Sequence, residues 1–152
     1  EVCVPLSIEA PILVKPSRES VIDNSLLLKH KTVLVIENEE RTLDAINQLL
    51  SNWGATVFAS KDVKQAIKVC QHAPDLMFLD YHLDDGLTGV QAAQQLREHW
   101  QDSTPNFVIP GILSSADRSE QTRKEAIDMA LHYLPKPIKT AALKRLIKQL
   151  KI

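Results

Sequence analysis

The chain is poor in cysteine: Cys3 and Cys70 are its only two, and they lie far apart without the spacing of a metal site. The sequence therefore indicates neither a disulfide framework nor a zinc site, and a reducing cytoplasm is the expected location. No apolar run approaches the roughly 18 residues of a membrane-spanning helix, and the N-terminus has no basic region followed by a hydrophobic one. We expect this fragment to make no contact with a membrane.

The chain also lacks an excess of charge of either sign, with 18 Lys and Arg against 19 Asp and Glu. Nucleic-acid binding usually requires a clustered basic excess, so we expect no nucleic-acid partner. Basic residues do gather between Lys139 and Lys151, where a solvated helix face explains them better than a nucleic-acid patch. The 152 residues, 44% of them hydrophobic, suffice for one domain with its own core.

Residues 1–30 differ from the rest of the chain. Apolar residues alternate between positions 2 and 8 as in a strand, but Pro5, Pro11 and Pro16 interrupt the pattern. We therefore expect a linker, or the end of a preceding domain, at residues 1–30 and a single domain at residues 31–152. Because the chain begins with Glu1 and not methionine, we expect it to be a fragment of a longer protein that could be anchored in a membrane.

From residue 31 onward, short apolar runs alternate five times with helical patterns. The expected strands are residues 33–36, 55–59, 76–79, 107–113 and 131–134. The expected helices cover residues 43–53, 63–70, 90–100 and 119–130, and a last one follows Thr140, with Ser60 and Thr140 as N-caps. This alternation predicts an α/β fold in which helices cover both faces of a parallel sheet.

Acidic and amide side chains follow two of the expected strands. Asp80 ends the third strand in the stretch LMFLDYHLDDGLTG, and Glu37 and Asn38 directly follow the first. In open parallel sheets, ligands bind beyond the carboxyl ends of the strands, where the strand order reverses. If the first and third strands are neighbours, the side-chain oxygens of Glu37, Asn38 and Asp80 converge. Together with the backbone carbonyl of His82 they suit Mg²⁺, and Mn²⁺ is the alternative cation.

The fourth and fifth strands deliver a hydroxyl and an amine to the same edge. Ser115 follows the fourth strand, and Ser114 is the alternative hydroxyl, although strand alternation directs only one of the two into the site. Lys136 follows the fifth strand and precedes Pro137, where a cis peptide bond would direct the amine into the site. An ammonium and a hydroxyl are suited to bind phosphoryl oxygens.

An ordered set of residues lies near the carboxyl ends of the expected strands: Glu37-Asn38, Asp80, Ser115-Ala116, Tyr133 and Lys136-Pro137. This ordered set resembles the receiver domain of two-component phosphorelays. The resemblance covers residues 31–152. The sequence from Asp80 to Gly89 is also similar to that of receivers at the C-terminus of hybrid histidine kinases. The resemblance implies a flavodoxin-like, doubly wound, five-stranded sheet of order 2-1-3-4-5 with five helices.

The resemblance also implies a function. Asp80 would accept a phosphoryl group from a phosphohistidine on a histidine kinase or histidine-phosphotransfer domain, and later lose it to water. Glu37, Asn38, Asp80 and the carbonyl of His82 would hold the cation. Lys136 and Ser115 would bind the phosphoryl oxygens, and Ser115 and Tyr133 would switch the face made by the fourth helix, fifth strand and fifth helix. Tyr133 could equally be a packing residue.

Three features depart from this picture. The family usually has two acids where this chain has Glu37-Asn38, so we expect weakened but retained Mg²⁺ binding. Pro110 falls inside the expected fourth strand, which requires a bulge or a later start. Asp84 and Asp85 read as loop or helix-capping residues and not as metal ligands.

Two other functions compete. A degenerate receiver would act through protein contacts alone, and Asn38 favours it, whereas Asp80 and Lys136 argue against it. A metal-dependent phosphatase of the haloacid-dehalogenase type would need its nucleophile after the first strand, where this chain has Glu37 and Asn38. The sequence leaves open whether the domain forms a homodimer.

Overall fold

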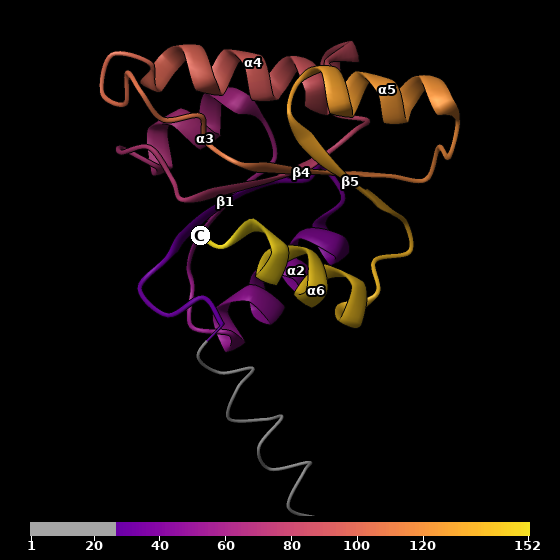
Figure 1. Cartoon of the computed structure of the whole chain (residues 1–152), viewed down its shortest axis with the longest axis horizontal. Helices are drawn as coiled ribbons and strands as arrows, with labels where there is room; N and C mark the ends of the chain where they lie inside the picture. Colours follow the sequence, from indigo (N-terminus) through magenta and orange to yellow (C-terminus); the bar gives the residue numbers. More distant parts are fainter. Residues whose placement is uncertain (1–26) are drawn as a thin grey trace, which may run out of the picture.

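The computed structural model describes residues 27–152, which fold as five β–α units (Figure 1). The expected linker at residues 1–30 lies mostly outside these residues, as does the side chain of Asp85. The strands are β1 (Thr32–Ile36), β2 (Thr56–Ser60), β3 (Leu76–Asp80), β4 (Gly111–Ser115) and β5 (Leu131–Pro135). The helices are α2 (Glu40–Asn52), α3 (Val63–Val69), α4 (Gly89–Trp100), α5 (Glu120–Asp128) and α6 (Thr140–Leu150), with a 3₁₀ turn, η1 (Asp84–Gly86), before α4.

All five strands pair in parallel in the order β2-β1-β3-β4-β5, which confirms the expected doubly wound sheet. β1 and β3 are neighbours, with Ile36 opposite Leu79, and β3 and β4 place Asp80 opposite Ser114. The order reverses between β1 and β3, so the carboxyl ends of these two strands meet at the switch point. Glu37 and Asp80 are therefore brought together by topology.

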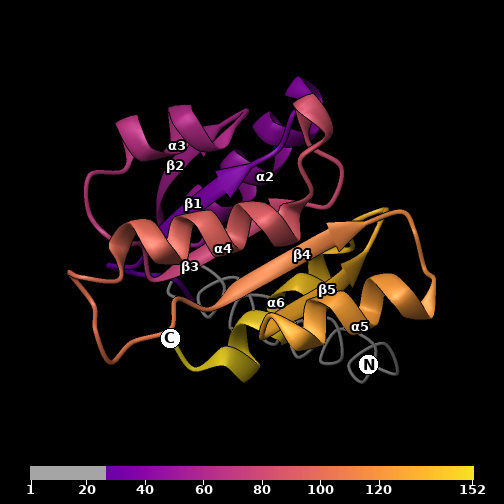
Figure 2. The ribbon, with the colours of Figure 1, turned by 90° about the horizontal axis from the view of Figure 1, so that it is seen from above.

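The sheet lies between two helical layers. Helices α3, α4 and α5 cover one face, and α2 and α6 cover the other (Figures 1 and 2). Each layer buries its own cluster: Leu79, Leu96 and Trp100 belong to the first, and Phe78 and Trp53 to the second. β3 is buried at every position, as its continuous apolar run predicts for a strand covered on both sides.

The N-terminal segment of the described chain is tied to the second layer. Leu28 is fully buried, and its backbone N–H donates to the carbonyl of Trp53 at 2.8 Å. Lys31 in turn donates its N–H to the carbonyl of Leu28. Residue 28 therefore contributes to the core ahead of β1.

Several element boundaries differ from the sequence expectation. β4 begins at Gly111 and not at Phe107, so Pro110 lies outside the strand, and its carbonyl accepts from the N–H of Met77. The later start removes the conflict between proline and strand pairing without a bulge. Phe107 and Val108 are consequently exposed.

Two expected helix caps are wrong. Asp62, not Ser60, caps α3, because its carboxylate accepts from the N–H of Gln65, whereas Ser60 is the last residue of β2. Thr140 is the first residue of α6, whose N-cap position is Lys139 and has no side-chain cap. In α3 the acceptor two residues after Ser60 satisfies the N-terminal N–H groups, whereas α6 begins without a side-chain cap, so cap preference alone does not fix where a helix starts.

Within residues 27–152, every helix is too short or too polar to cross a bilayer.

Candidate functional site

One lysine joins two carboxylates at the carboxyl edge of the sheet. Lys136, which follows β5, places its Nζ 3.0 Å from Oδ1 of Asp80 at the end of β3 and 3.2 Å from Oε2 of Glu37 just after β1. The peptide bond between Lys136 and Pro137 is cis. The backbone N–H of Lys136 donates to the carbonyl of Ser115 at 2.9 Å, which fixes the start of this loop against β4. The three strand ends thus converge as the topology requires.

Burial and opposite charge together set the electrostatics of this triad. The side chain of Glu37 is 1% exposed and that of Lys136 is 25% exposed. Burial, with a smaller contribution from the charge of Asp80, raises the pKa of Glu37, although the N–H of Glu39 and the Lys136 ammonium oppose the shift. Burial lowers the pKa of Lys136, but hydrogen bonds and charges from Asp80 and Glu37 outweigh it, and the net shift is upward. The lysine is therefore held as a cation against Asp80.

Glu37 and Asn38 have different partners. The Oε1 atom of Glu37 accepts from the N–H of Glu39, which closes the turn between β1 and α2. The amide of Asn38 points to the loop after β3, where its Nδ2 donates to Oδ1 of Asp84 at 3.0 Å. Asp84 was expected to be a loop or capping residue, and it does begin η1, but it also contacts the residue that replaces the usual acid.

The two serines of β4 are both fully buried but differ in their contacts. Oγ of Ser115 accepts from the N–H of Asp117 at 3.0 Å. Oγ of Ser114 has no hydrogen-bond partner among the described residues. Ser115 is the last residue of β4, next to the start of the Lys136 loop, and of the two serine hydroxyls only that of Ser115 has a hydrogen-bond partner among the described residues.

Tyr133 is bound to the loop between β4 and α5. Its hydroxyl donates to the carbonyl of Asp117 at 2.6 Å, and Arg123 lies over its ring, 5.3 Å from the centroid. The carboxylate of Asp117 accepts from the N–H of Ser119, and this and other hydrogen bonds lower the pKa of Asp117. The Tyr133 ring is therefore held at the loop whose Asp117 also contacts the Ser115 hydroxyl.

The loop after β3 packs tightly around Asp80. His82 forms an isolated bridge with Thr88, its ring lies edge-on to that of Tyr81, and its side chain is exposed. The hydroxyl of Tyr81 donates to Oε2 of Glu125 on α5 at 3.0 Å. At Gly89, a Cβ atom would come within 2.4 Å of the carbonyl oxygen of Asp80, so no larger residue fits without a shift.

The contacts of Gly89 and Asp84 with the site were not predicted from the sequence. The glycine in the stretch after Asp80 was a visible signal, because a glycine at the start of a helix near a strand end suits a close backbone approach. No signal in one sequence pairs Asn38 with Asp84, since the two are joined only by the sheet order.

The donor atoms fit a hard divalent cation. Glu37 and Asp80 supply carboxylates, Asn38 supplies an amide, and all the expected ligand atoms are oxygen, which matches Mg²⁺ and Mn²⁺. Among the described residues, no group of three or more His, Cys, Asp and Glu side chains is placed to hold a metal. The expected ligands thus comprise only two acids, Glu37 and Asp80, with the Asn38 amide and the backbone carbonyl of His82. So few charged ligands suit a cation that keeps several of its waters.

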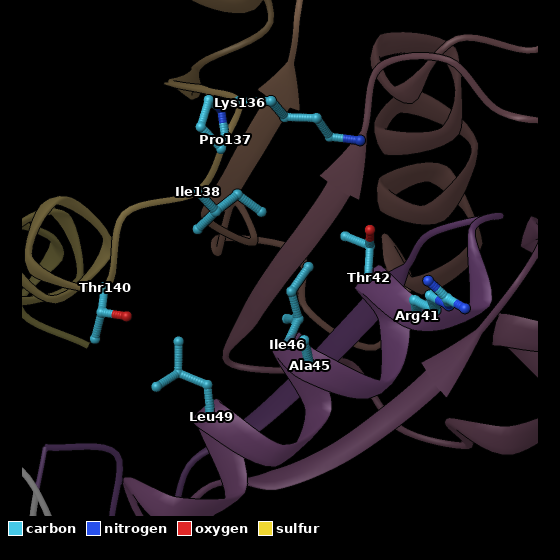
Figure 3. Close-up of a pocket in the computed structure, with 9 residues that line it drawn as sticks. All are labelled: Arg41, Thr42, Ala45, Ile46, Leu49, Lys136, Pro137, Ile138 and Thr140. Atoms are coloured by element: carbon cyan, nitrogen blue, oxygen red, sulfur yellow. The ribbon is translucent and has the colours of Figure 1, made fainter.

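A groove of about 490 Å³ opens beside Lys136 (Figure 3). One wall comes from α2, where Ile46 and Leu49 point toward the loop after β5. Pro137 and Ile138 form the opposite wall, and Arg41 and Thr42 lie at the end nearer the lysine amine. The lining is mainly apolar, with cationic groups on both walls.

Comparison with known proteins agrees with this geometry. The sequence model of the family described as "Response regulator receiver domain" matches residues 33–148. The chain is 28% identical over 120 residues to the "Uncharacterized transcriptional regulatory protein YrkP" of Bacillus subtilis, covering 78% of this chain and 49% of that protein. It therefore spans about half the length of this relative. It is also 26% identical over 124 residues to an uncharacterized 14.6 kDa protein of Leptolyngbya boryana, covering 80% of this chain and 91% of that one.

Solved structures show the same fold. A two-component response regulator from Clostridium difficile superposes with a TM-score of 0.69 at 20% identity, covering 80% of this chain and 96% of that one. The chemotaxis protein CheY4 of Vibrio cholerae gives 0.68 at 18% identity, covering 78% and 97%. At such identities the likeness establishes the fold alone, but the family match covers most of the chain. The chain belongs to the response regulator receiver domain family.

Proposed function

We propose that this domain accepts a phosphoryl group from a phosphohistidine onto Asp80, with Mg²⁺ as cofactor. The observation that carries the proposal is the position of the Lys136 ammonium, 3.0 Å from the Asp80 carboxylate and 3.2 Å from Glu37, at the open edge of the sheet. A scaffold that works by protein contact alone has no evident need for a partly buried lysine beside a buried aspartate.

The transfer is a substitution at phosphorus. A carboxylate oxygen of Asp80 forms the new P–O bond, the P–N bond to the imidazole breaks, and the leaving nitrogen keeps the electron pair. Lys136 is placed to neutralise charge on one phosphoryl oxygen. The hydroxyl of Ser115 can donate a hydrogen bond to another phosphoryl oxygen while its Oγ still accepts from the N–H of Asp117. Mg²⁺, when bound, would supply further neutralisation of the oxygens and orient the reacting groups.

Phosphorylation by a small-molecule donor tests the acceptor role. Incubation with acetyl phosphate and Mg²⁺, followed by intact-protein mass spectrometry, should show a gain of one phosphoryl group. Asp80→Asn should abolish the gain, and Asp102→Asn, which neutralises an exposed acid, should leave it unchanged. Absence of labelling on the wild type, under conditions that label another receiver domain, would contradict the proposal.

We further propose that the histidine-bearing partner docks along the groove between α2 and the loop after β5. The groove adjoins Lys136, so a partner seated there brings its histidine to the Asp80 edge, and its apolar walls suit the apolar face of a partner helix. Ala45→Glu places a charge on the exposed part of this wall. The variant should label normally with acetyl phosphate yet lose transfer from a phosphorylated kinase or phosphotransfer domain that labels the wild type.

The wider context follows the resemblance noted above. We propose that the domain is part of a hybrid histidine kinase and works in the cytoplasm, because the stretch after Asp80 is similar to receivers of that class. This placement in a hybrid kinase would be tested by comparing which phosphorylated partners transfer to this domain alone and which transfer to the domain fused to a histidine kinase core.

The second candidate is a degenerate receiver that binds partners without phosphorylation. Asn38 favours it, because an amide stands where the family usually has an acid and one negative charge is missing from the cation site. This candidate expects partner binding that is unchanged by Asp80→Asn and by removal of Mg²⁺. A loss of binding on either change would decide for the phosphoacceptor.

A further inference from the structure

Two loops of the cation site are joined by one side-chain contact. Asn38 lies after β1, Asp84 lies after β3, and Nδ2 of the first donates to Oδ1 of the second at 3.0 Å. The two residues are far apart in the sequence, and they meet only because β1 and β3 are adjacent in the sheet. The contact therefore spans the switch point itself.

The loop that carries Asp84 is closed by its own hydrogen bonds. The N–H of Leu83 donates to the carbonyl of Leu87 at 3.1 Å, and the N–H of Leu87 donates to the carbonyl of Asp84 at 3.4 Å. The left-handed conformation of Gly86, with φ of +73°, completes the turn. Asp84 is thus held by a folded loop on one side while Asn38 is held by the Glu37 turn on the other.

The chemistry of the pair fixes the orientation of the amide. An ionised carboxylate only accepts hydrogen bonds, so the NH₂ group of Asn38 must face Asp84. The carbonyl Oδ1 of Asn38 is then directed away from Asp84 and is the amide atom free to serve as a cation ligand. Without the aspartate, the amide has no such reason to present its oxygen in place of its nitrogen.

The pair also accounts for the charge that Asn38 lacks. A carboxylate at position 38 would lie at hydrogen-bond distance from Asp84 with no proton between them, and the two would repel. With an amide at 38, a carboxylate at 84 is attracted and adds one negative charge beside the site. The two residue choices are therefore consistent with each other.

We propose that Asp84 is a positioning residue of the cation site, which orients the Asn38 amide and supplies the negative charge that an acid at position 38 would otherwise give. The proposal rests on the phosphoacceptor function and deepens it. It predicts that the departure from the usual acidic pair is compensated within this chain, so that Mg²⁺ binding is retained.

Isothermal titration calorimetry of the unphosphorylated chain with MgCl₂ tests the proposal. Asp84→Ala should raise the dissociation constant for Mg²⁺ about tenfold, in the range found when a partner of a metal ligand is removed. Asp128→Asn, which neutralises an exposed acid at the far end of α5, should change it less than twofold, about the scatter of such a comparison. The swap N38D/D84N should stay within about threefold of the wild type, because it restores one acid and one amide.

A metal-free measurement separates orientation from charge. The side-chain NH₂ protons of Asn38, followed by ¹⁵N NMR in EDTA, should shift and exchange faster in Asp84→Ala but not in Asp128→Asn. Equal Mg²⁺ affinity in the wild type and Asp84→Ala would overturn the proposal, as would a wild type that binds no Mg²⁺. Mg²⁺ binding that depends on Asp84 in a chain that acetyl phosphate cannot label would overturn only the phosphoacceptor function.

Discussion

The ammonium nitrogen of Lys136 lies 3.0 Å from Oδ1 of Asp80, at the point where the ends of β5 and β3 approach one another. The same nitrogen lies 3.2 Å from Oε2 of Glu37, so a single cation is shared by two nearly buried acids. A buried acid without a partner would take up a proton and lose its charge. The lysine therefore stabilises negative charge at this edge of the sheet.

Removing the ammonium should change the titration of Glu37. In Lys136→Met, the burial that raises the pKa of Glu37 stays while the opposing cation is lost, so the pKa should move further up. A ¹³C NMR titration of the Glu37 carboxyl carbon measures this directly. Lys124→Met, which removes an exposed cation on α5, should leave the titration unchanged, and an unchanged or lowered pKa in Lys136→Met would contradict the expectation.

The raised pKa of Glu37 also predicts that the stability of the domain depends on pH. A carboxyl whose pKa is raised on folding binds its proton more tightly in the native state than in the unfolded state. The contribution of Glu37 to the free energy of unfolding should therefore fall as pH rises from 4.5 through its native pKa. In Lys136→Met this fall should extend to higher pH. Urea unfolding across that range checks the sign, with Glu37→Gln as the variant that removes the dependence.

Gly89→Ala should destabilise the domain and disturb the phosphoacceptor. The added Cβ would lie 2.4 Å from the carbonyl oxygen of Asp80 and 2.6 Å from Cδ1 of Leu113, and the first of these is backbone that cannot rotate away. We expect a loss of about 1–3 kcal/mol in urea unfolding, the usual cost of overpacking, despite the higher helix propensity of alanine. Labelling by acetyl phosphate should slow as well.

The matched control for this variant is Gly86→Ala. Its Cβ would meet no atom within 4 Å, so its cost of about 1–2 kcal/mol should come only from the positive φ of +73°. Labelling should then be slowed by Gly89→Ala alone. Equal effects of the two variants on labelling would show that the contact with Asp80 is unimportant.

Much of the site could be predicted from the sequence because it depends on strand ends. Five apolar runs in alternation with helical patterns fix a parallel sheet, and a parallel sheet places every strand's carboxyl end at one edge. Glu37, Asp80 and Lys136 lie at the carboxyl ends of β1, β3 and β5, so their meeting required only the strand order. The resemblance to receivers supplied that order, and the structure confirms it.

Other features depend on contacts that one sequence does not encode locally. The start of β4 at Gly111 is set by pairing with Met77 of β3 and Leu131 of β5, which overrides the apolar character of Phe107 and Val108. The cap of α3 was missed because Ser60 and Asp62 could both satisfy the same N–H groups, and α6 begins at Thr140 without any side-chain cap. Arg97 was missed altogether, since nothing in its helix pattern distinguishes it from a solvated arginine.

Arg97→Ala should be strongly destabilising. The Arg97 guanidinium donates to the carbonyl of Ile109 from Nε at 3.1 Å and Nη2 at 2.8 Å, and to those of Met129 and Ala130 after α5. Truncation would leave these carbonyls with fewer donors, and we expect a loss of about 1–3 kcal/mol in urea unfolding. Arg97→Lys should recover only part of it, because an ammonium cannot reproduce the planar fork.

The control for Arg97 is Arg41→Ala, which removes an exposed arginine at the groove on the other side of the sheet. Its effect on unfolding should stay within about 0.5 kcal/mol, as for most surface substitutions. A loss in Arg97→Ala no larger than this would show that water replaces the guanidinium at the carbonyls of Ile109 and Met129.

Tyr133→Phe tests whether the tyrosine restrains the loop between β4 and α5. The variant keeps the ring but removes the hydroxyl that donates to the carbonyl of Asp117 at 2.6 Å, so we expect a modest loss of about 0.5–1.5 kcal/mol in urea unfolding. Amide hydrogen exchange of Asp117 and Ser119 should accelerate, because the loop is released from β5. Thr104→Val is the matched control, since it removes a hydroxyl that donates to the carbonyl of Trp100 at the end of α4 and its loss should spare these amides. If exchange in the loop is equal in both variants, Tyr133 acts as a packing residue, and its hydroxyl does not hold the segment that carries Ser115.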